Sequence, residues 1–422
     1  MCCLTLLFFI GEDYHWVMTQ TMTSQQVDEI KQSVCRDIDS RAKDLVSISH
    51  QIHEKPETNF EEHFAHKILT DYIADSKINV TRGAFDLETA FDVRVSGGNG
   101  PTVAVLCEYD ALPGIGHACG HNIIATAGLG AGLALSAVAE QCGGNLALMG
   151  TPAEEGGGGK IEMARKGAFR GIDAAMMIHP ADADLARMNA IAIQNLFVKF
   201  HGLAAHAAVS PHKGKNALDA AVLGYMNIAA LRQHILPTER IHGIFTNSGE
   251  KPNIVPRETE MDWYVRSPTI ETLQPLKQRV VQCLDAGAMA AGCTVTFDWK
   301  KNTFADLVDN VPLLESYIRN AERFGRKMTT DFLPGTGGGS TDMGNISYLV
   351  PSIHPMLQVA PSGVSLHSAA FADHTKGEEA SRAIVDGAKI MAMTAIDMWL
   401  SPTLQKQVKV AFGDGVVPEG VI

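Results

Sequence analysis

The chain has 422 residues, of which 45% are hydrophobic, and its formal net charge is −12. A chain of this length can bury a large core and usually divides into two or more domains. The acidic balance argues against nucleic acid or an anionic membrane surface as a partner, because both attract a basic face. The eight cysteines show no disulfide spacing, so we expect reduced thiols in a cytoplasmic protein.

Residues 1–21 begin with a short apolar run. No basic segment precedes this run, and Gly-Glu-Asp stands where a signal peptide would have its small-residue cleavage site. The run is also too short to span a bilayer. We expect residues 1–21 to be a disordered extension or a mis-assigned start, with Met18 or Met22 as alternative starts. A poorly formed signal peptide is the other alternative.

The next part of the chain alternates helical patterns with strongly apolar strands. This alternation is typical of an α/β sheet that is buried on both faces, and it predicts a mixed, largely parallel sheet covered by helices. We expect helices at 25–54, 61–73, 123–138 and 160–166, and strands at 92–95, 102–106, 145–149 and 174–178.

The pattern changes over residues 189–302. The predicted order is strand, helix, strand, strand, helix and strand, which is the ferredoxin-like β-α-β-β-α-β unit. We therefore expect a small domain inserted into a larger one that is formed by residues 22–188 and 303–422. The elements of the small domain are expected at 191–200, 216–234, 240–247, 258–267, 270–291 and 294–300.

Candidate metal ligands follow the predicted strands of the larger domain. Thiolate, imidazole and carboxylate groups all bind transition metals, and open α/β sheets gather their sites at the carboxyl ends of strands. Of two adjacent glutamates, one can bind metal and the other can act as general base. These groups suffice for two metal ions if one ligand bridges, with zinc as the first choice and manganese or cobalt as alternatives. The candidates are Cys119, His121, Glu154, Glu155, His179 and His367.

The motifs around these residues resemble metallopeptidase family 20, the aminoacylase and glutamate-carboxypeptidase group. A cysteine among the ligands resembles its amidohydrolase subfamily, and the closest likeness is to aminoacylase-1-like dipeptidases and p-aminobenzoyl-glutamate hydrolases. The resemblance covers residues 25–400. It rests on Glu-Tyr-Asp-Ala-Leu-Pro from Glu108, His-Ala-Cys-Gly-His-Asn from His117, Pro-Ala-Glu-Glu-Gly from Pro152, His-Pro from His179 and Leu-His-Ser from Leu366.

The resemblance implies a role for each residue of the centre. Glu154 would be the general base, and Asp110 would orient a ligand histidine. Other family members carry aspartate or histidine at the position of Glu108, so no role is assigned to it. The metal ligands would be Cys119, which bridges, with His121, Glu155, His179 and His367.

The resemblance also implies substrate-binding residues. His206 in the inserted domain would reach the substrate carbonyl, often across a dimer formed by that domain. Asn253 and Arg266 would hold the substrate carboxylate or the amide oxygen. The glycine-rich loop, with Gly338 and Gly339, lacks the lysine and the spacing of a phosphate-binding loop and would border the carboxylate.

The expected activity is hydrolysis of an N-acyl amino acid or dipeptide with a free carboxylate, by a metal-bound hydroxide and a glutamate base. Two alternatives remain open. Cys119 could be a nucleophile with a histidine base, although the paired glutamates and His367 would then have no role. A family relative without catalytic activity could act as a binding subunit, but no ligand or base is missing here.

Overall fold

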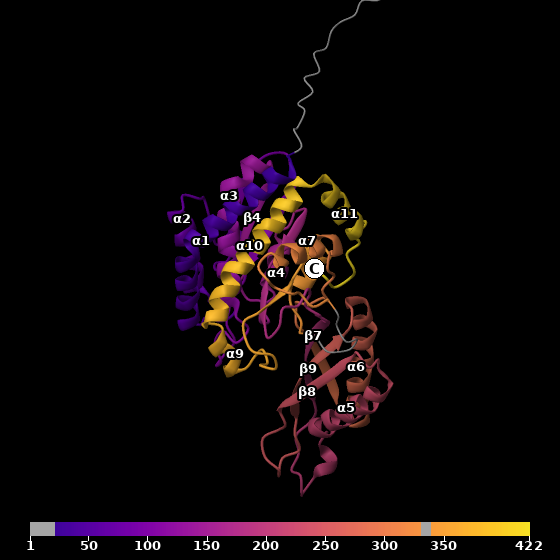
Figure 1. Cartoon of the computed structure of the whole chain (residues 1–422). Coiled ribbons are helices and arrows are strands. Elements are labelled where there is room, and N and C mark those ends of the chain that lie inside the picture. Colours follow the sequence, from indigo (N-terminus) through magenta and orange to yellow (C-terminus); the bar gives the residue numbers. More distant parts are fainter. Residues whose placement is uncertain (1–21, 331–338) are drawn as a thin grey trace, which may run out of the picture.

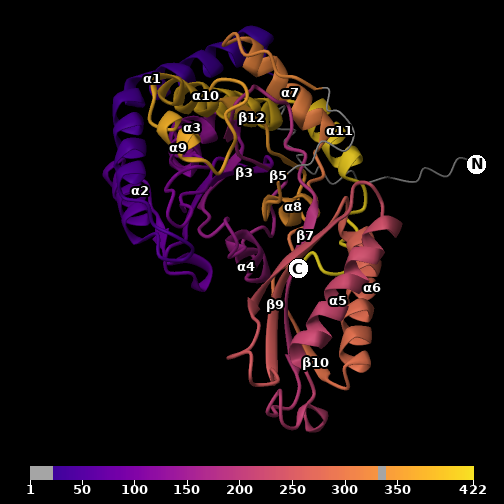
Figure 2. The same ribbon diagram turned by 90° about the horizontal axis from the view of Figure 1, so that it is seen from below.

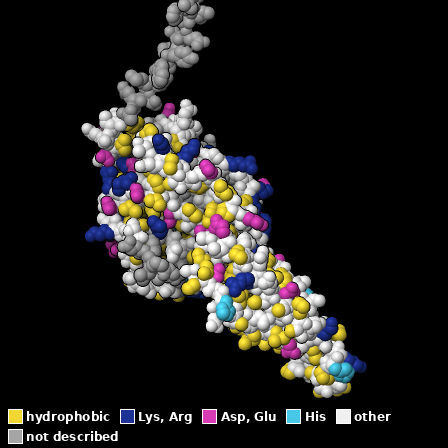
Figure 3. All heavy atoms as spheres, turned by 90° about the vertical axis from the view of Figure 1, so that its right-hand side faces the viewer, with side chains coloured by type: hydrophobic (Ala, Val, Ile, Leu, Met, Phe, Trp, Pro, Cys, Tyr) yellow, Lys and Arg dark blue, Asp and Glu magenta, His cyan; other side chains and the backbone are white. Residues whose placement is uncertain are grey.

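The computed structural model describes residues 22–330 and 339–422. The expected extension over residues 1–21 and the candidate Gly338 lie outside the described residues. The chain forms a larger domain and a smaller domain that extends from it (Figure 1). The smaller domain forms a narrow lobe (Figure 3).

The larger domain contains a six-stranded sheet in the order β1-β2-β4-β3-β5-β11. The strands β3, β4, β5 and β11 are parallel, whereas β2 runs antiparallel to both of its neighbours. The predicted mixed, largely parallel sheet is therefore confirmed. The strands are β1 (Thr81–Arg82), β2 (Phe91–Ser96), β3 (Thr102–Cys107), β4 (Asn145–Gly150), β5 (Ala174–Met176) and β11 (Ser352–Ile353), and a separate parallel pair is formed by β6 (His179–Ala181) and β12 (Met356–Gln358).

Helices cover both faces of this sheet (Figure 2). Successive side chains of a strand point to opposite faces, so Val103 and Val105 of β3 join the core under α3, whereas Ala104 and Leu106 join a smaller core under α4 and α8. The helices are α1 (Ser24–Glu54), α2 (His63–Asp75), α3 (His121–Cys142), α4 (Gly159–Arg165), α7 (Val311–Glu322), α8 (Met343–Ser347), α9 (Ala369–His374), α10 (Glu378–Leu400) and α11 (Pro402–Phe412), with a 3₁₀ turn at Ala84–Asp86.

Helix α3 is the central helix of the larger core and packs against α1, α10 and β3. Among the described residues it alone has the length and hydropathy to cross a membrane, but 89% of its most apolar window is buried inside the fold. A helix that is covered by neighbours on all sides is expected to be apolar around its whole circumference, which explains the high hydropathy of α3.

The smaller domain is the predicted ferredoxin-like unit. Its four strands are antiparallel in the order β10-β7-β9-β8, and it has a core of its own around Trp263. Its elements are β7 (Ala192–His201), α5 (Ala217–Leu231), β8 (Arg240–Asn247), β9 (Glu258–Ser267), α6 (Ile270–Ala290) and β10 (Thr294–Trp299), with 3₁₀ turns at Pro211–Lys213 and Arg232–His234.

The two helices of the smaller domain pack closely at two glycines, Gly224 and Gly287. A Cβ atom on Gly287 of α6 would lie 2.6 Å from the carbonyl oxygen of Ala220 in α5 and even closer to the backbone nitrogen of Gly224. Backbone atoms cannot move aside as the end of a flexible side chain can. The absence of a side chain at residue 287 therefore sets the separation of the helices.

We predict that Gly287→Val lowers the free energy of unfolding of the smaller domain by about 1–3 kcal/mol, the usual cost of overpacking. Thermal unfolding monitored by tryptophan fluorescence, with Trp263 in the affected core, would measure the change. Ala286→Val introduces the same β-branched residue at the neighbouring exposed position and should have a much smaller effect. Equal midpoints for the two variants would contradict the packing argument.

Candidate metal centre

The loop between β3 and α3 is shaped by one glycine. Gly120 has a φ of +76°, in the left-handed region that favours glycine, and it lies between Cys119 and His121. A Cβ atom at this position would also lie 2.7 Å from Cγ of Pro180, the residue after His179. Glycine therefore allows the loop that carries two candidate ligands to approach the segment that carries a third.

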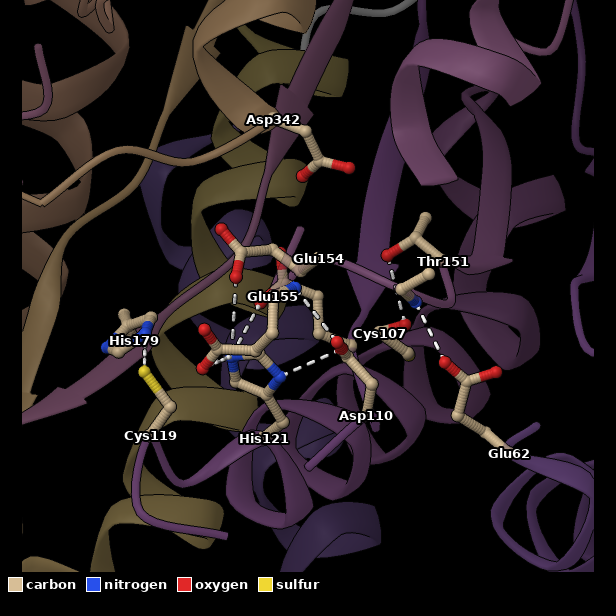
Figure 4. A network of polar contacts seen from close by, with 12 residues as sticks. Glu62, Cys107, Asp110, Cys119, His121, Thr151, Glu154, Glu155, His179 and Asp342 are labelled. Carbon is tan, nitrogen blue, oxygen red and sulfur yellow. Dashed lines mark hydrogen bonds and ion pairs between the residues drawn. The ribbon is translucent and has the colours of Figure 1, made fainter. Parts of the chain in front are cut away.

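Four of the predicted ligands, Cys119, His121, Glu155 and His179, lie close together at this loop (Figure 4). Sγ of Cys119 lies 3.6 Å from Nε2 of His179 and 3.3 Å from Nε2 of His367. Oε1 of Glu155 lies 3.7 Å from the same nitrogen of His367 and 3.9 Å from Nε2 of His121. All five residues that were predicted as ligands therefore direct a donor atom into one region.

Asp110 supports two of these ligands. Its Oδ1 accepts a hydrogen bond from Nδ1 of His121 at 3.0 Å, and its Oδ2 accepts one from the backbone nitrogen of Glu155 at 2.9 Å. Nδ1 of His179 donates similarly to the carbonyl oxygen of Pro180 at 2.7 Å. In both histidines Nδ1 is engaged, so Nε2 is available to bind metal.

The donor atoms fit a metal ion. Within the described part of the chain, Nε2 of His121 and Oε1 of Glu155 are buried without a hydrogen-bond partner. A buried polar atom without a partner costs free energy, and a metal ion would satisfy both atoms at once. The set of one sulfur, three imidazole nitrogens and a carboxylate is suited to zinc and related transition metals.

The electrostatics of the site follow from burial. Burial, together with the nearby His121, lowers the pKa of His179 to about 3, so its imidazole is neutral as metal binding requires. Burial and the carboxylates of Glu108 and Glu155 raise the pKa of Glu154 well above its usual range. Burial would also raise the pKa of Asp110, but His121 outweighs it and holds this pKa below the usual value.

A cavity of about 780 Å³ opens beside the ligands and extends to the smaller domain. Arg266 lines it from β9, and its Nε is buried with no hydrogen-bond partner among the residues described. Burial lowers the pKa of this guanidinium, which lies 5.9 Å from the ring centre of Tyr264. Gly339 also lines the cavity, and its role beside the substrate stays a prediction.

Two predicted residues lie elsewhere. His206 and Asn253 are exposed and do not line the cavity. They are joined through the backbone, because the nitrogen of Ala207 donates to the carbonyl oxygen of Asn253 at 3.0 Å. Their predicted role in the site stays a prediction.

One group of charged residues beside the centre is not predicted from the sequence. Glu108, Lys160 and Asp342 are fully buried, and the ammonium of Lys160 contacts both carboxylates. The motifs assign no role to Glu108, and Lys160 follows the run of four glycines without any motif of its own. The available signal is a lysine five residues after Glu155, in an otherwise glycine-rich segment.

The region that contains these residues matches a known family. Residues 104–397 match the model described as peptidase family M20/M25/M40. The chain belongs to this family. It is 37% identical to a mouse protein named Xaa-Arg dipeptidase over 406 residues, which cover 93% of this chain and 94% of that protein. It is 27% identical to a p-aminobenzoyl-glutamate hydrolase component of Escherichia coli (strain K12), covering 90% and 94%.

Solved structures show the same fold. A Bacillus subtilis protein described as a dinuclear metal binding peptidase from the M20 family has a TM-score of 0.66 and 18% identity, covering 85% of this chain and 98% of that one. A Staphylococcus aureus protein described as a putative aminohydrolase has a TM-score of 0.72 and 18% identity, covering 88% and 100%. Family membership and the curated relatives make this chain a metal-dependent hydrolase of peptide or amide bonds, as the motifs predicted.

We predict that removal of divalent metals abolishes turnover and that adding zinc, manganese or cobalt restores it, because the metal ligands enclose the reacting region. Activity would be measured after exhaustive chelation and again after the metal is returned. Alkylation of Cys119 should also inactivate the enzyme, since it removes a ligand. Full activity after chelation, combined with loss after alkylation, would instead support a cysteine nucleophile.

Proposed function

We propose that this enzyme is a dinuclear dipeptidase that hydrolyses dipeptides or N-acyl amino acids with a free carboxylate. The observation that carries the proposal is that four candidate ligands, Cys119, Glu155, His179 and His367, line one cavity together with Glu154. The fifth candidate ligand, His121, is buried beside Glu155. Two divalent ions, zinc in the first instance, would be held by Cys119, His121, Glu155, His179 and His367, with Cys119 as the bridge. When bound, they would supply Lewis-acid activation of a water molecule and of the amide carbonyl.

The protein's own residues transfer the proton, position the ligands and bind the substrate. Glu154 takes a proton from the attacking water and passes it to the leaving nitrogen, and its raised pKa suits a group that must do both. Asp110 holds His121 and the backbone at Glu155 in place. Arg266 binds the substrate carboxylate, since a half-buried guanidinium whose Nε has no hydrogen-bond partner among the described residues is suited to an anion.

The relatives suggest two substrate classes. The mouse and human relatives, at 37% and 36% identity, are named for dipeptides that end in arginine, and we propose this class first. Acyl-glutamates are the second candidate, after the name of the E. coli relative. A specific observation favours them: Lys300 lines the cavity in addition to Arg266, so two cations are available for two carboxylates.

We predict that Glu154→Gln keeps two metal ions per chain and loses about 10²–10⁴-fold in kcat, the usual contribution of a general base. Rates would be measured on a panel of dipeptides ending in arginine and of acyl-glutamates, together with metal analysis of the variant. Glu140→Gln makes the same change at an exposed position on α3 and should keep the full rate. Near-normal turnover of Glu154→Gln would exclude Glu154 as the base.

We also propose a cytoplasmic homodimer formed through the smaller domain. Two features support this arrangement. Strand β8 is an edge strand of the sheet, and apolar side chains are exposed beside it, with 59% of Met226 on α5 and 65% of Ile244 on β8 accessible. The stacked rings of Tyr225 and Phe245 join α5 to β8 on the face of the sheet that the helices cover, whereas Ile244 points to the other face. The edge strand therefore has exposed apolar side chains on both sides.

We predict that Met226→Glu combined with Ile244→Glu gives a monomer in sedimentation velocity, because two charges would be buried without partners in the interface. The monomer should also lose turnover, since His206 and Asn253 could not reach a second cavity. Met289→Glu alters a side chain on α6 that is 77% exposed, and this control should remain a dimer. A double variant that still dimerises would place the interface elsewhere.

A further inference from the structure

A lysine ammonium is buried behind the candidate metal centre. Lys160 has no accessible side-chain surface, and its Nζ lies 2.6 Å from Oδ1 of Asp342 and contacts Oε1 of Glu108. The backbone nitrogen of Lys160 also donates to Oδ2 of Asp342 at 2.8 Å. Asp342 therefore holds both ends of this residue, and the lysine is fixed at the start of α4.

The same carboxylates adjoin the reacting groups. Oxygen atoms of Glu108, Glu154 and Asp342 all lie within 4.8 Å of one another, and Asp342 lies beside Glu154 in the close-up (Figure 4). Oε2 of Glu108 is buried, has no hydrogen-bond partner in the described chain and lies 3.5 Å from Nε2 of His121. The carboxylate of Glu108 thus contacts the lysine and also lies close to the candidate base Glu154 and the candidate ligand His121.

Three buried carboxylates at this separation need a positive charge, because the burial of unpaired charges is unfavourable. Their spacing would suit a divalent cation bound by oxygen ligands. The ammonium of Lys160 supplies a positive charge from the protein itself, because it contacts two of the three carboxylates, those of Glu108 and Asp342. Among the contacts of the described residues, none joins Lys160 to the third carboxylate, that of Glu154.

We propose that Lys160 is a positioning residue whose ammonium takes the place of a third metal ion beside Glu154. By neutralising Glu108 and Asp342 it keeps divalent ions at the centre formed by Cys119, His121 and their partners. It also fixes the carboxylates that surround Glu154, so that the side chain of Glu154 faces the cavity. The inference rests on the proposed role of Glu154 as general base.

The test is Lys160→Met, which keeps the length of the side chain and removes its charge. We expect the variant to bind three zinc ions per chain where the wild type binds two, measured by metal analysis after dialysis against zinc. We expect kcat to fall about 10–100-fold, as for other residues that orient a metal centre, with KM changed less than about twofold. Lys166→Met removes an exposed lysine at the end of α4 and should change neither quantity.

A second variant covers the case in which Lys160→Met does not fold. Lys160→Met with Asp342→Asn removes one charge of each sign, and it should bind two zinc ions with kcat still reduced about 10–100-fold. Two zinc ions and a near-normal kcat in either variant would overturn the proposal. A parallel loss of thermal stability and kcat in Lys160→Met, without a third zinc ion, would show a purely structural salt bridge and would also overturn it. The results for the two Lys160 variants do not affect the expected loss of kcat in Glu154→Gln. The proposed role of Lys160 and the proposed role of Glu154 as general base can therefore fail separately.

Discussion

The carboxylate of Asp110 joins the two segments that carry the proposed base and three of the proposed ligands. One oxygen binds the ring of His121 at the start of α3, and the other binds the backbone at Glu155 after β4, 45 residues away in the sequence. This common partner ties the two loops together beyond the strand ends, where Thr151 already bonds to the carbonyl oxygen of Cys107. Since β3 and β4 are adjacent and parallel, Asp110 needs to span only the width of one strand pair. The geometry of the centre therefore depends on one buried side chain and on the register of two strands.

Charge is the second constraint on this region. Glu108, Asp110, Glu154 and Asp342 are all buried, and a cluster of this kind would be unstable without compensation. The protein provides part of the compensation itself, through His121 beside Asp110 and through Lys160 between Glu108 and Asp342. Divalent ions at the donor atoms would provide the rest. We therefore expect metal binding and the stability of the larger domain to be thermodynamically linked.

Much of this arrangement could be predicted from the sequence because the informative patterns are local. The strand and helix periods indicate both sheets, and the ligands follow the strands in motifs only a few residues long. The Glu108–Lys160–Asp342 group could not be found in the same way, because Glu108 and Asp342 are 52 and 182 residues from Lys160 and no spacing relates them. His206 and Asn253 illustrate another limit: a sequence motif can indicate a site residue without indicating its distance from the cavity, and neither residue lines the cavity of the chain described.

The cavity has one wall on each domain. The proposed ligands and Glu154 belong to the larger domain, whereas Arg266 belongs to β9 of the smaller one. Where the chain enters the smaller domain, the nitrogen of Ile191 donates to the carbonyl oxygen of Gly339 at 3.1 Å, and Oγ of Ser340 donates to the carbonyl oxygen of Ile191 at 2.7 Å. If Arg266 binds the terminal carboxylate, the angle between the domains determines how far that carboxylate lies from the scissile bond. The substrate length that the enzyme accepts would then depend on how rigidly this connection holds the two domains. It would depend less on the shape of the cavity surface in either domain.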